Sequence, residues 1–482
     1  MGSPKALLLS REIRYDLPFG LFCIASSLKK NDIDIVFSSW DHGEIKNKIR
    51  HYEPQIIIIT LYDSTLSDTI KLIKFLRGAT KAFISVGGPM PTLYPKEALF
   101  HSGADIAIRG EAENILPRLI KSITDNNTAL ETIPGIIVKS GDKIAADTTQ
   151  ANNLLSQDEL NNMDLDYNII VDGYFDENFF NLSQGIRFTS SRGCPYSCIF
   201  CSHIHGKQFR AMGAGKIISE LKKIDSAITN KEKIELAKAL KINESNFEKS
   251  AEKIIIMRKI IFNDDDFFID RERALEFFEK ASKDDVILKR FWFIFQAGIK
   301  SFIKNGIVDN ELISAIKKVN TIMLQVGTDS FTTSELKNMS KGYTFDDIRK
   351  VISAFENNKI ANLHYLILSN LFTTPGNIID NLKNIVELKT RFKFFNILSV
   401  NKWIIPYCGT PAQTLAASRG YGKQLSGRVF RLRAHPDLDF TYYDKLNAAD
   451  IRVVKFIDRL NQKEIEENDI NKINKIISQV PR

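Results

Sequence analysis

Two regions of the chain alternate short apolar runs with amphipathic segments of helical length. In residues 5–125, apolar runs such as "PQIIIITLY" and "AFISVGG" alternate with segments such as "LSDTIKLIKFLRGA". Strand-sized runs separated by amphipathic helices are typical of a parallel, doubly wound sheet. We therefore expect a Rossmann-like α/β unit here, with ligands at the carboxyl ends of its strands. The segment "IPGIIVKSGDKI" at 133–144 predicts a hairpin that turns on Gly141 and Asp142.

The second region predicts a (β/α)6 partial barrel. Six apolar runs, from "GIRFTSS" to "FFNILSVNKWIIP", are separated by helix-like segments such as "TFDDIRKVISAFENN". In barrels of this kind the chemistry lies on the loops that follow the strands. The expected organisation is a first α/β unit at 1–150, a connector at 151–184, a barrel at 185–411 with a helical insertion at 227–257, and a small mixed C-terminal region at 412–482.

Composition and charge exclude several function classes. The 482 residues are 44% hydrophobic and 26% charged, as in an ordinary globular protein of two or three domains. No apolar stretch approaches the ~20 residues that a membrane helix needs, so we expect a cytoplasmic protein without a membrane span. The net charge of +8 comes from scattered lysines, without any run of five or six basic residues. This pattern does not predict a nucleic-acid partner.

Three of the five cysteines lie within eight residues. Cys194, Cys198 and Cys201 have C-x3-C-x2-C spacing, and clustered thiols in a reducing compartment more often bind metal than form disulfides. One interpretation is a zinc site completed by His203 or His205. The other is a 4Fe-4S cluster, which normally takes four cysteines, so that three leave one iron without a protein ligand. Catalytic metal sites keep one coordination position open and structural sites close it, so a cluster on three cysteines would indicate catalysis.

The cysteine loop resembles the signature of the radical S-adenosylmethionine (SAM) superfamily, C-x3-C-x-Φ-C with an aromatic residue at Φ, here Phe200. Together with "GKQFR" at 206–210, it resembles the subfamily that carries an N-terminal cobalamin-binding domain. The stretches "IIFNDDDFFID", "VGTDSFTTSELKNMSKGYT" and "IIPYCGTPAQ" resemble the second, fourth and sixth barrel strands of that subfamily. "VGGPMPTLYPKEAL" and "DIAIRGEAEN" resemble its cobalamin domain, and the likeness covers most of residues 5–415.

The resemblance implies a 4Fe-4S cluster on the three cysteines and SAM at the open iron. Reductive cleavage of SAM would give a 5′-deoxyadenosyl radical that abstracts hydrogen from an unactivated carbon. The implied contacts are Phe200 with adenine, Asp264 and Asp265 with the SAM amine, Asp329 and Ser330 with the ribose, and Asn370 with the substrate. The family usually has glutamate where Asp329 stands. An aspartate before "RERALEFF" can instead cap a helix, a role that suits Asp270 best.

The same resemblance implies a cobalamin site at the strand ends of the first unit. Its expected contacts are Leu17, Pro18, Phe19, Gly20, Thr60, Tyr62, Gly87, Gly88 and Glu111. Glycines there let the cofactor approach the backbone closely. None of the seven histidines lies in a D-x-H-x-x-G motif, so no imidazole is expected below the cobalt. A degenerate domain kept as a scaffold is the alternative.

The function that follows is a cobalamin-dependent radical SAM methyltransferase acting at an unactivated carbon, or phosphorus, of a small molecule or natural product. An external one-electron donor of the flavodoxin or ferredoxin type is implied. The alternative is an oxidoreductase, cyclase or ring-rearranging enzyme with the same cofactors but no methyl transfer, and a remote one is a structural zinc-binding module. Cys408, in the Gly-Thr-Pro loop, is interpreted as a catalytic thiol or an incidental apolar residue. Methylthio transfer is set aside because only Cys23 lies in the first unit.

Overall fold

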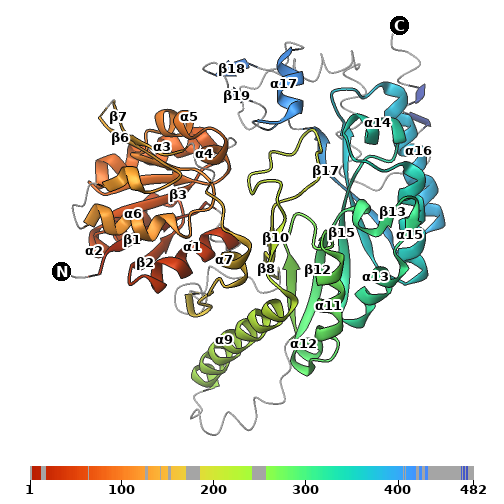
Figure 1. The fold of residues 1–482 in the computed structure, drawn as a ribbon, viewed down its shortest axis with the longest axis horizontal. Coiled ribbons are helices and arrows are strands. Elements are labelled where there is room, and N and C mark those ends of the chain that lie inside the picture. Colours follow the sequence, from red (N-terminus) through yellow and green to blue (C-terminus); the bar gives the residue numbers. More distant parts are fainter. Residues whose placement is uncertain are drawn as a thin grey trace.

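The computed structural model consists of two α/β units that lie next to each other (Figure 1). It describes residues 3–11, 18–62, 65–124, 129–141, 143–149, 153–169, 185–240, 257–404, 407, 409–418, 423–425, 429–431, 468, 471–472 and 474–475. Leu17 and Cys408 therefore lie outside the described residues. Within the described part, no helix is both long and apolar enough to cross a membrane.

The N-terminal unit is built on a seven-stranded sheet with the order β2-β1-β3-β4-β5-β6-β7. Its strands are β1 (Lys5–Leu9), β2 (Asp34–Ser38), β3 (Ile56–Thr60), β4 (Phe83–Gly87), β5 (Ile106–Ile108), β6 (Ile136–Ser140) and β7 (Lys143–Asp147). The first five are mutually parallel, which confirms the predicted doubly wound sheet. The predicted hairpin is also present, and it joins the same sheet as an antiparallel edge.

Helices cover both faces of this sheet, which explains why its strands are almost continuously apolar. They are α1 (Phe19–Lys30), α2 (His42–Tyr52), α3 (Leu66–Ala79), α4 (Pro89–Leu93), α5 (Pro95–Ser102), α6 (Ile115–Thr124) and the 3-10 helix η2 (Ala129–Thr132). Alternate residues of β1 enter different cores: Ala6 and Leu8 pack with α1 and α6, whereas Leu7 and Leu9 pack with α2, α3 and α5. We had not predicted α2 and α5, each of which buries only two apolar side chains.

The second unit is an open, six-stranded parallel sheet with the order β17-β16-β15-β12-β11-β8. Its strands are β8 (Ile186–Phe188), β11 (Arg258–Phe262), β12 (Phe291–Ala297), β15 (Thr321–Asp329), β16 (Asn362–Ser369) and β17 (Phe395–Trp403). Neighbours in the sheet are neighbours in sequence, as a singly wound partial barrel requires, and the predicted (β/α)6 architecture is confirmed. Phe291, Phe293 and Phe295 are fully buried against the helices, whereas Trp292 on the other face is 45% exposed.

The remaining elements of this unit are mostly the helices between its strands. They are α9 (Ala214–Leu240), α11 (Arg271–Ala281), α12 (Asp285–Arg290), η4 (Ile299–Phe302), β13 (Ile303–Lys304), β14 (Ile307–Val308), α13 (Asn310–Ala315), η5 (Ile316–Lys318), α14 (Thr333–Asn338), α15 (Phe345–Asn357) and α16 (Pro375–Arg391). The charged stretch that we expected as an insertion from residue 227 begins inside α9, which is one helix of 27 residues. Residues 241–256 of that stretch lie outside the described residues.

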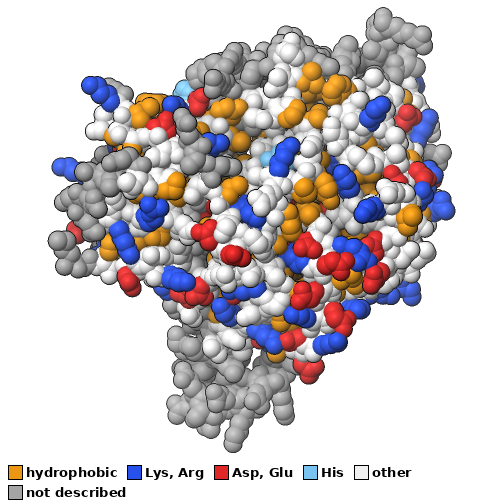
Figure 2. Space-filling model, viewed as in Figure 1, with side chains coloured by type: hydrophobic (Ala, Val, Ile, Leu, Met, Phe, Trp, Pro, Cys, Tyr) orange, Lys and Arg blue, Asp and Glu red, His pale blue; other side chains and the backbone are white. Residues whose placement is uncertain are grey.

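Short elements connect and follow the two units. α7 (Gln157–Asn161) lies in the expected connector, and a two-stranded ladder of β9 (Ser191–Arg192) and β10 (Arg210–Ala211) flanks the cysteine loop. α17 (Pro411–Ser418), β18 (Lys423–Leu425) and β19 (Val429–Arg431) follow the barrel, and most of the expected C-terminal region lies outside the described residues. On the face shown in Figure 2, basic side chains are interspersed with acidic ones.

Candidate functional site

A cavity of about 690 Å³ lies between the carboxyl edge of the N-terminal sheet and the cysteine loop of the second unit. Its volume is in the range of small-molecule and cofactor sites. From the N-terminal unit its wall includes Pro18, Phe19, Gly20, Thr60, Tyr62, Gly87, Gly88, Glu111 and Glu113, and from the second unit Arg187, Arg192, Cys201, His203, His205, Asn263 and Asp265. The structure therefore brings together all the expected cobalamin contacts that lie among the described residues, and it places Cys201 of the cysteine loop in the same cavity.

The cysteine loop, residues 193–209, is closed at its neck by the β9–β10 ladder. Gly193 has φ +86°, and a Cβ atom there would lie 2.2 Å from the Gln208 carbonyl oxygen, so only glycine fits at the neck. Inside the loop, the amide of Cys194 donates to the Gly206 carbonyl at 3.3 Å and that of Cys201 to the Cys198 carbonyl at 3.2 Å. The three cysteines are free thiols of intermediate burial.

This donor set fits an iron–sulfur cluster. Burial raises the pKa of Cys194 to about 12 and also raises that of Cys201, so these thiols need a positive metal centre to become thiolates. Among the described residues, no three Cys, His, Asp or Glu side chains gather around a single-ion position. The Nδ1 atom of His205 is 3.1 Å from Glu111 Oε1, so it is engaged away from the cysteines. Of the two histidines named for a zinc site, His205 is thus engaged by Glu111, whereas His203 lines the cavity with Cys201.

A lysine that the sequence analysis missed lies beside the loop. The Nζ atom of Lys341 is 2.5 Å from Asp329 Oδ2 and 5.7 Å from the centre of the Phe200 ring. Burial would lower the pKa of Lys341, but the charge of Asp329 outweighs it and holds this pKa well above its ordinary value. Asp329 is thus paired rather than free. Lys341 belongs to the stretch "VGTDSFTTSELKNMSKGYT", but a sequence does not show that a lysine is buried, and burial is what marks this one out.

Phe200 belongs to a small separate core. It packs against a buried cluster that includes Met339, Leu371 and Ala412, from three segments of the second unit. The Ile199 amide donates to the Met339 carbonyl at 3.3 Å, and the Ala412 amide donates to the Ile199 carbonyl at 2.9 Å. The aromatic position of the motif is therefore fixed against the end of the barrel.

Ser330 and Asn370 meet in a buried network around Glu335, another residue that we had not predicted. Glu335 accepts hydrogen bonds from Asn370 Nδ2 at 3.1 Å, Asn381 Nδ2 at 3.0 Å and Ser330 Oγ at 3.3 Å, and also from the Thr373 hydroxyl. Burial raises the pKa of Glu335, since no cation faces it within this network. Ser330 and Asn370 therefore join the ends of β15 and β16, and neither lines the cavity.

Three consecutive aspartates after β11 lie in different surroundings. Asp264 is buried and accepts from the Ser190 and Ser191 amides, both at 2.6 Å, so it holds the start of the cysteine loop and does not face the cavity. Asp265 lines the cavity. Asp266 is buried and accepts from Ser301 Oγ at 2.6 Å, and burial raises its pKa to about 7.

Asp270 caps α11, because its carboxylate accepts from the Arg273 amide at 3.1 Å. This confirms the capping role that the sequence indicated for it. Of the two aspartates expected at the SAM amine, only Asp265 is placed where a ligand in the cavity can meet it.

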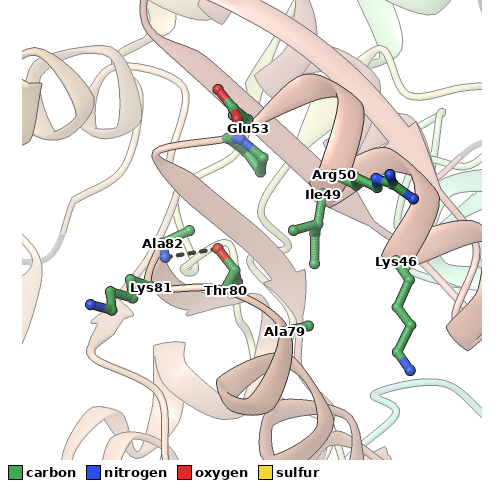
Figure 3. Close-up of a pocket in the computed structure, with 9 residues that line it drawn as sticks. Lys46, Ile49, Arg50, Glu53, Ala79, Thr80, Lys81 and Ala82 are labelled. Carbon is green, nitrogen blue, oxygen red and sulfur yellow. Dashed lines mark hydrogen bonds between the residues drawn. The ribbon is translucent and has the colours of Figure 1, made fainter.

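A second hollow of about 640 Å³ lies at the amino edge of the N-terminal sheet (Figure 3). Lys46, Arg50 and Lys81 are among the residues that line it. In Figure 3, Lys81 points away from Lys46 and Arg50, so the three cations do not converge on one point. None of the expected site residues lies there.

Comparison with known proteins supports a two-part architecture. Residues 9–120 match the family model of the B12 binding domain. The anaerobic magnesium-protoporphyrin IX monomethyl ester cyclase of Cereibacter sphaeroides is 23% identical over 331 residues, which is 66% of this chain and 47% of that protein. The hopanoid C-3 methylase of Methylococcus capsulatus is 25% identical over 234 residues, which is 46% of this chain and 43% of that protein. The chain thus spans less than half the length of these curated relatives.

Two solved structures share the fold. The radical SAM methyltransferase TsrM from Kitasatospora setae, solved with cobalamin and a 4Fe-4S cluster, has a TM-score of 0.64 at 13% identity, over 88% of this chain and 76% of TsrM. The cobalamin-dependent SAM radical enzyme OxsB, solved with aqua-cobalamin and SAM, has a TM-score of 0.67 at 15% identity, over 99% of this chain and 71% of OxsB. The chain therefore carries a B12-binding domain and has the fold of the cobalamin-dependent radical SAM enzymes, whose signature its cysteine loop resembles.

Proposed function

We propose that this chain is a cobalamin-dependent radical SAM methyltransferase that acts at an unactivated carbon, or phosphorus, of a small molecule. One observation carries the proposal: a single cavity is lined both by the strand-end glycines of the B12-binding domain and by Cys201 of the cysteine loop. Two cofactors bound at these places would face each other across the space that a substrate must enter. When bound, the cluster with SAM supplies a 5′-deoxyadenosyl radical, and cobalamin supplies the methyl group.

The chain's own residues bind and orient these groups. Gly88 has φ +98°, and a Cβ atom there would lie 3.0 Å from the Thr60 methyl group, so the bare backbone at this strand end leaves room for a flat ligand. Cys194, Cys198 and Cys201 would hold the cluster. The buried fixed charges near the loop would act in a water-poor space, where their electrostatic interaction with a bound group is stronger than in solvent.

The assigned SAM contacts combine the cavity with the barrel end beside the cysteine loop, because Phe200, Lys341 and Asp329 do not line the cavity itself. Asp265 is the aspartate after β11 that faces the cavity, and we assign it to the SAM amine. Phe200 would lie near the adenine. The Lys341–Asp329 pair lies beside Phe200, with Lys341 presenting a positive charge and Asp329 an acceptor. We assign the pair to the carboxylate and ribose of SAM, so Asp329 keeps its expected role with Lys341 as its partner.

An anaerobic experiment without the natural substrate tests the proposal. Protein reconstituted with iron, sulfide and cobalamin is incubated with trideuteromethyl SAM and a strong one-electron reductant. We expect the deuterated methyl group on cobalamin, and 5′-deoxyadenosine as a second product. A variant with alanine at all three loop cysteines is the control, and it should form no 5′-deoxyadenosine. Cobalamin without label in the wild type would reject methyl transfer.

The cyclase relative, which aligns over 66% of this chain, favours a second candidate function. In that case the chain uses the same cofactors for a cyclisation or another oxidation without methyl transfer. The experiment separates the two, because this candidate gives 5′-deoxyadenosine and no label on cobalamin.

The partner and the compartment are also part of the proposal. The reduced cluster needs an external one-electron donor, and we propose a flavodoxin- or ferredoxin-like protein. Free thiols at the cluster site suit the reducing environment of the cytoplasm. A small-molecule or natural-product substrate suits a cavity of about 690 Å³.

A further inference from the structure

The neck of the cysteine loop brings two arginines face to face. In the β9–β10 ladder, Arg192 is directly opposite Arg210, and the two side chains are only 6% and 3% exposed. Like charges opposite each other on paired strands are destabilising, and burial increases the effect because the charges are less screened. Closing this neck therefore requires negative charge from elsewhere.

The loop itself cannot supply that charge. Residues 193–209 contain no aspartate or glutamate, and they add Lys207 and two histidines to the positive side. The neutralising groups come instead from the segment after β5 in the B12-binding domain, where Glu111 and Glu113 are both buried.

Glu111 binds both arginines at once. Its Oε1 accepts from Arg210 Nη2 at 2.9 Å, and its Oε2 accepts from Arg210 Nη1 at 3.0 Å and is 3.3 Å from Arg192 Nη1. Oε2 also accepts from the Leu155 amide at 2.7 Å. Arg192 has a second partner, because its Nη2 donates to Glu113 Oε1 at 2.6 Å. The carboxylate that binds Arg210 is that of Glu111. We call the four side chains of Glu111, Glu113, Arg192 and Arg210 the neck clamp.

The neck clamp also forms part of the cavity wall. Glu111, Glu113 and Arg192 line the cavity together with Cys201. Three of the four side chains that close the cysteine loop thus also border the space assigned to cobalamin.

We propose that Glu111 is a positioning residue: through Arg210 and Arg192 it closes the cysteine loop and fixes its thiols against the B12-binding domain. The role of those thiols as cluster ligands rests on the proposed function. The positioning of the loop does not, and it can be measured on the cluster-free protein.

The test variant is Glu111→Gln, which keeps the shape of the side chain and removes its charge. It leaves Arg210 buried without a carboxylate. The matched control is Asp225→Asn in α9, because Asp225 is also bound by two arginines, Arg258 and Arg290 (2.9 Å to Arg290 Nε), but lies outside the loop.

The first readout is alkylation of Cys194, Cys198 and Cys201 in the cluster-free protein, followed by mass spectrometry. We expect these thiols to react about tenfold faster or more in Glu111→Gln, since an unpaired buried charge favours local opening. Asp225→Asn should stay within about twofold of the wild type. Equal rates in Glu111→Gln and the wild type would overturn the proposal.

The second readout tests the charge argument by rescue. Glu111→Gln combined with Arg210→Gln removes the whole charge pair, and its thiols should react more slowly than those of the single variant. Equal rates in the single and double variants would overturn the argument. In the reconstituted protein, Glu111→Gln should also hold less iron per chain than Asp225→Asn. A wild type without iron would refute the proposed function and leave the alkylation result standing.

Discussion

At the scale of single residues, burial decides what a carboxylate does. Asp264, Asp265 and Asp266 are adjacent in sequence, but only Asp265 faces the cavity. The side chains of Asp264 and Asp266 are enclosed and accept hydrogen bonds from neighbouring serines. Their chemical identity is the same, and their hydrogen-bond partners differ because the loop turns sharply after β11.

Lys341 provides the first prediction at this scale. Lys341→Met removes the buried cation beside Phe200 and leaves the Asp329 carboxylate unpaired. We expect 5′-deoxyadenosine formation from SAM to fall about tenfold or more, because a misplaced SAM loses its orientation at the cluster. The control is Lys337→Met on the exposed side of α14, which should keep wild-type cleavage. Unchanged cleavage in Lys341→Met would remove this residue from the site.

Asp266 gives a pH-dependent prediction. Burial raises its pKa from 3.8 to about 7, so the folded protein favours the protonated carboxyl. The stability from this group is fully present below about pH 4 and is lost as the pH rises through about 7, a difference on the order of 4 kcal/mol. Asp266→Asn should therefore gain stability relative to the wild type between pH 4 and 8. Urea unfolding of the cluster-free protein at each pH measures this gain in the free energy of unfolding, and the exposed Asp285→Asn is the control. A gain that does not change with pH would contradict the raised pKa of Asp266.

At the scale of elements, the loops that follow parallel strands carry the site, and glycines decide how closely they approach each other. Gly193 closes the cysteine loop, and Gly110 lets the segment after β5 pass the Asn153 carbonyl, which a Cβ atom would approach to 2.2 Å. Both have positive φ values, where other residues are strained.

A pair of glycine substitutions tests this. Gly193→Ala would place a methyl group 2.2 Å from the Gln208 carbonyl oxygen, so we expect the neck to open and iron binding after reconstitution to fall severalfold. Gly78→Ala, in helix α3 with no atom within 4 Å of the new methyl group, should leave iron binding unchanged and raise stability by about 0.5–1 kcal/mol. Full iron binding in Gly193→Ala would show that the cysteine loop binds iron without a closed neck.

At the scale of the whole molecule, the two units share one apolar core as well as one cavity. Phe19 of α1, which lines the cavity, packs edge-on against Phe188 of β8 with ring centres 5.3 Å apart. Phe22 packs against Tyr167 of the connector at 5.2 Å. These contacts hold the B12-binding domain against the barrel without using the three loop cysteines.

The two cofactor sites should therefore be separable by mutation. Alanine at Cys194, Cys198 and Cys201 removes the proposed cluster ligands and leaves the neck clamp and the aromatic contacts intact. We expect iron to fall to background while cobalt per chain, measured by mass spectrometry after reconstitution with cobalamin, stays within about twofold of the wild type. Loss of both metals together would show that the cobalamin site depends on the cluster.

How much the sequence determined depends on the range of the interactions involved. The apolar periodicity predicted both sheets and most helices, because alternation along a strand or helix is a local pattern. The spacing of the three cysteines likewise indicated one metal centre, since all its ligands lie on one short loop. The boundaries of the domains and the roles of the individual contacts stay predictions.

Only the tertiary structure decided which charges meet. Nothing local links Glu111 to Arg192 and Arg210, or Lys341 to Phe200, because these pairs come from different loops. It also gave Asp264 and Asp265 different surroundings. Asp264, which we expected at SAM, instead accepts hydrogen bonds from the Ser190 and Ser191 amides. Electrostatic pairing and burial depend on distance in space, and a sequence specifies that distance only after the chain has folded.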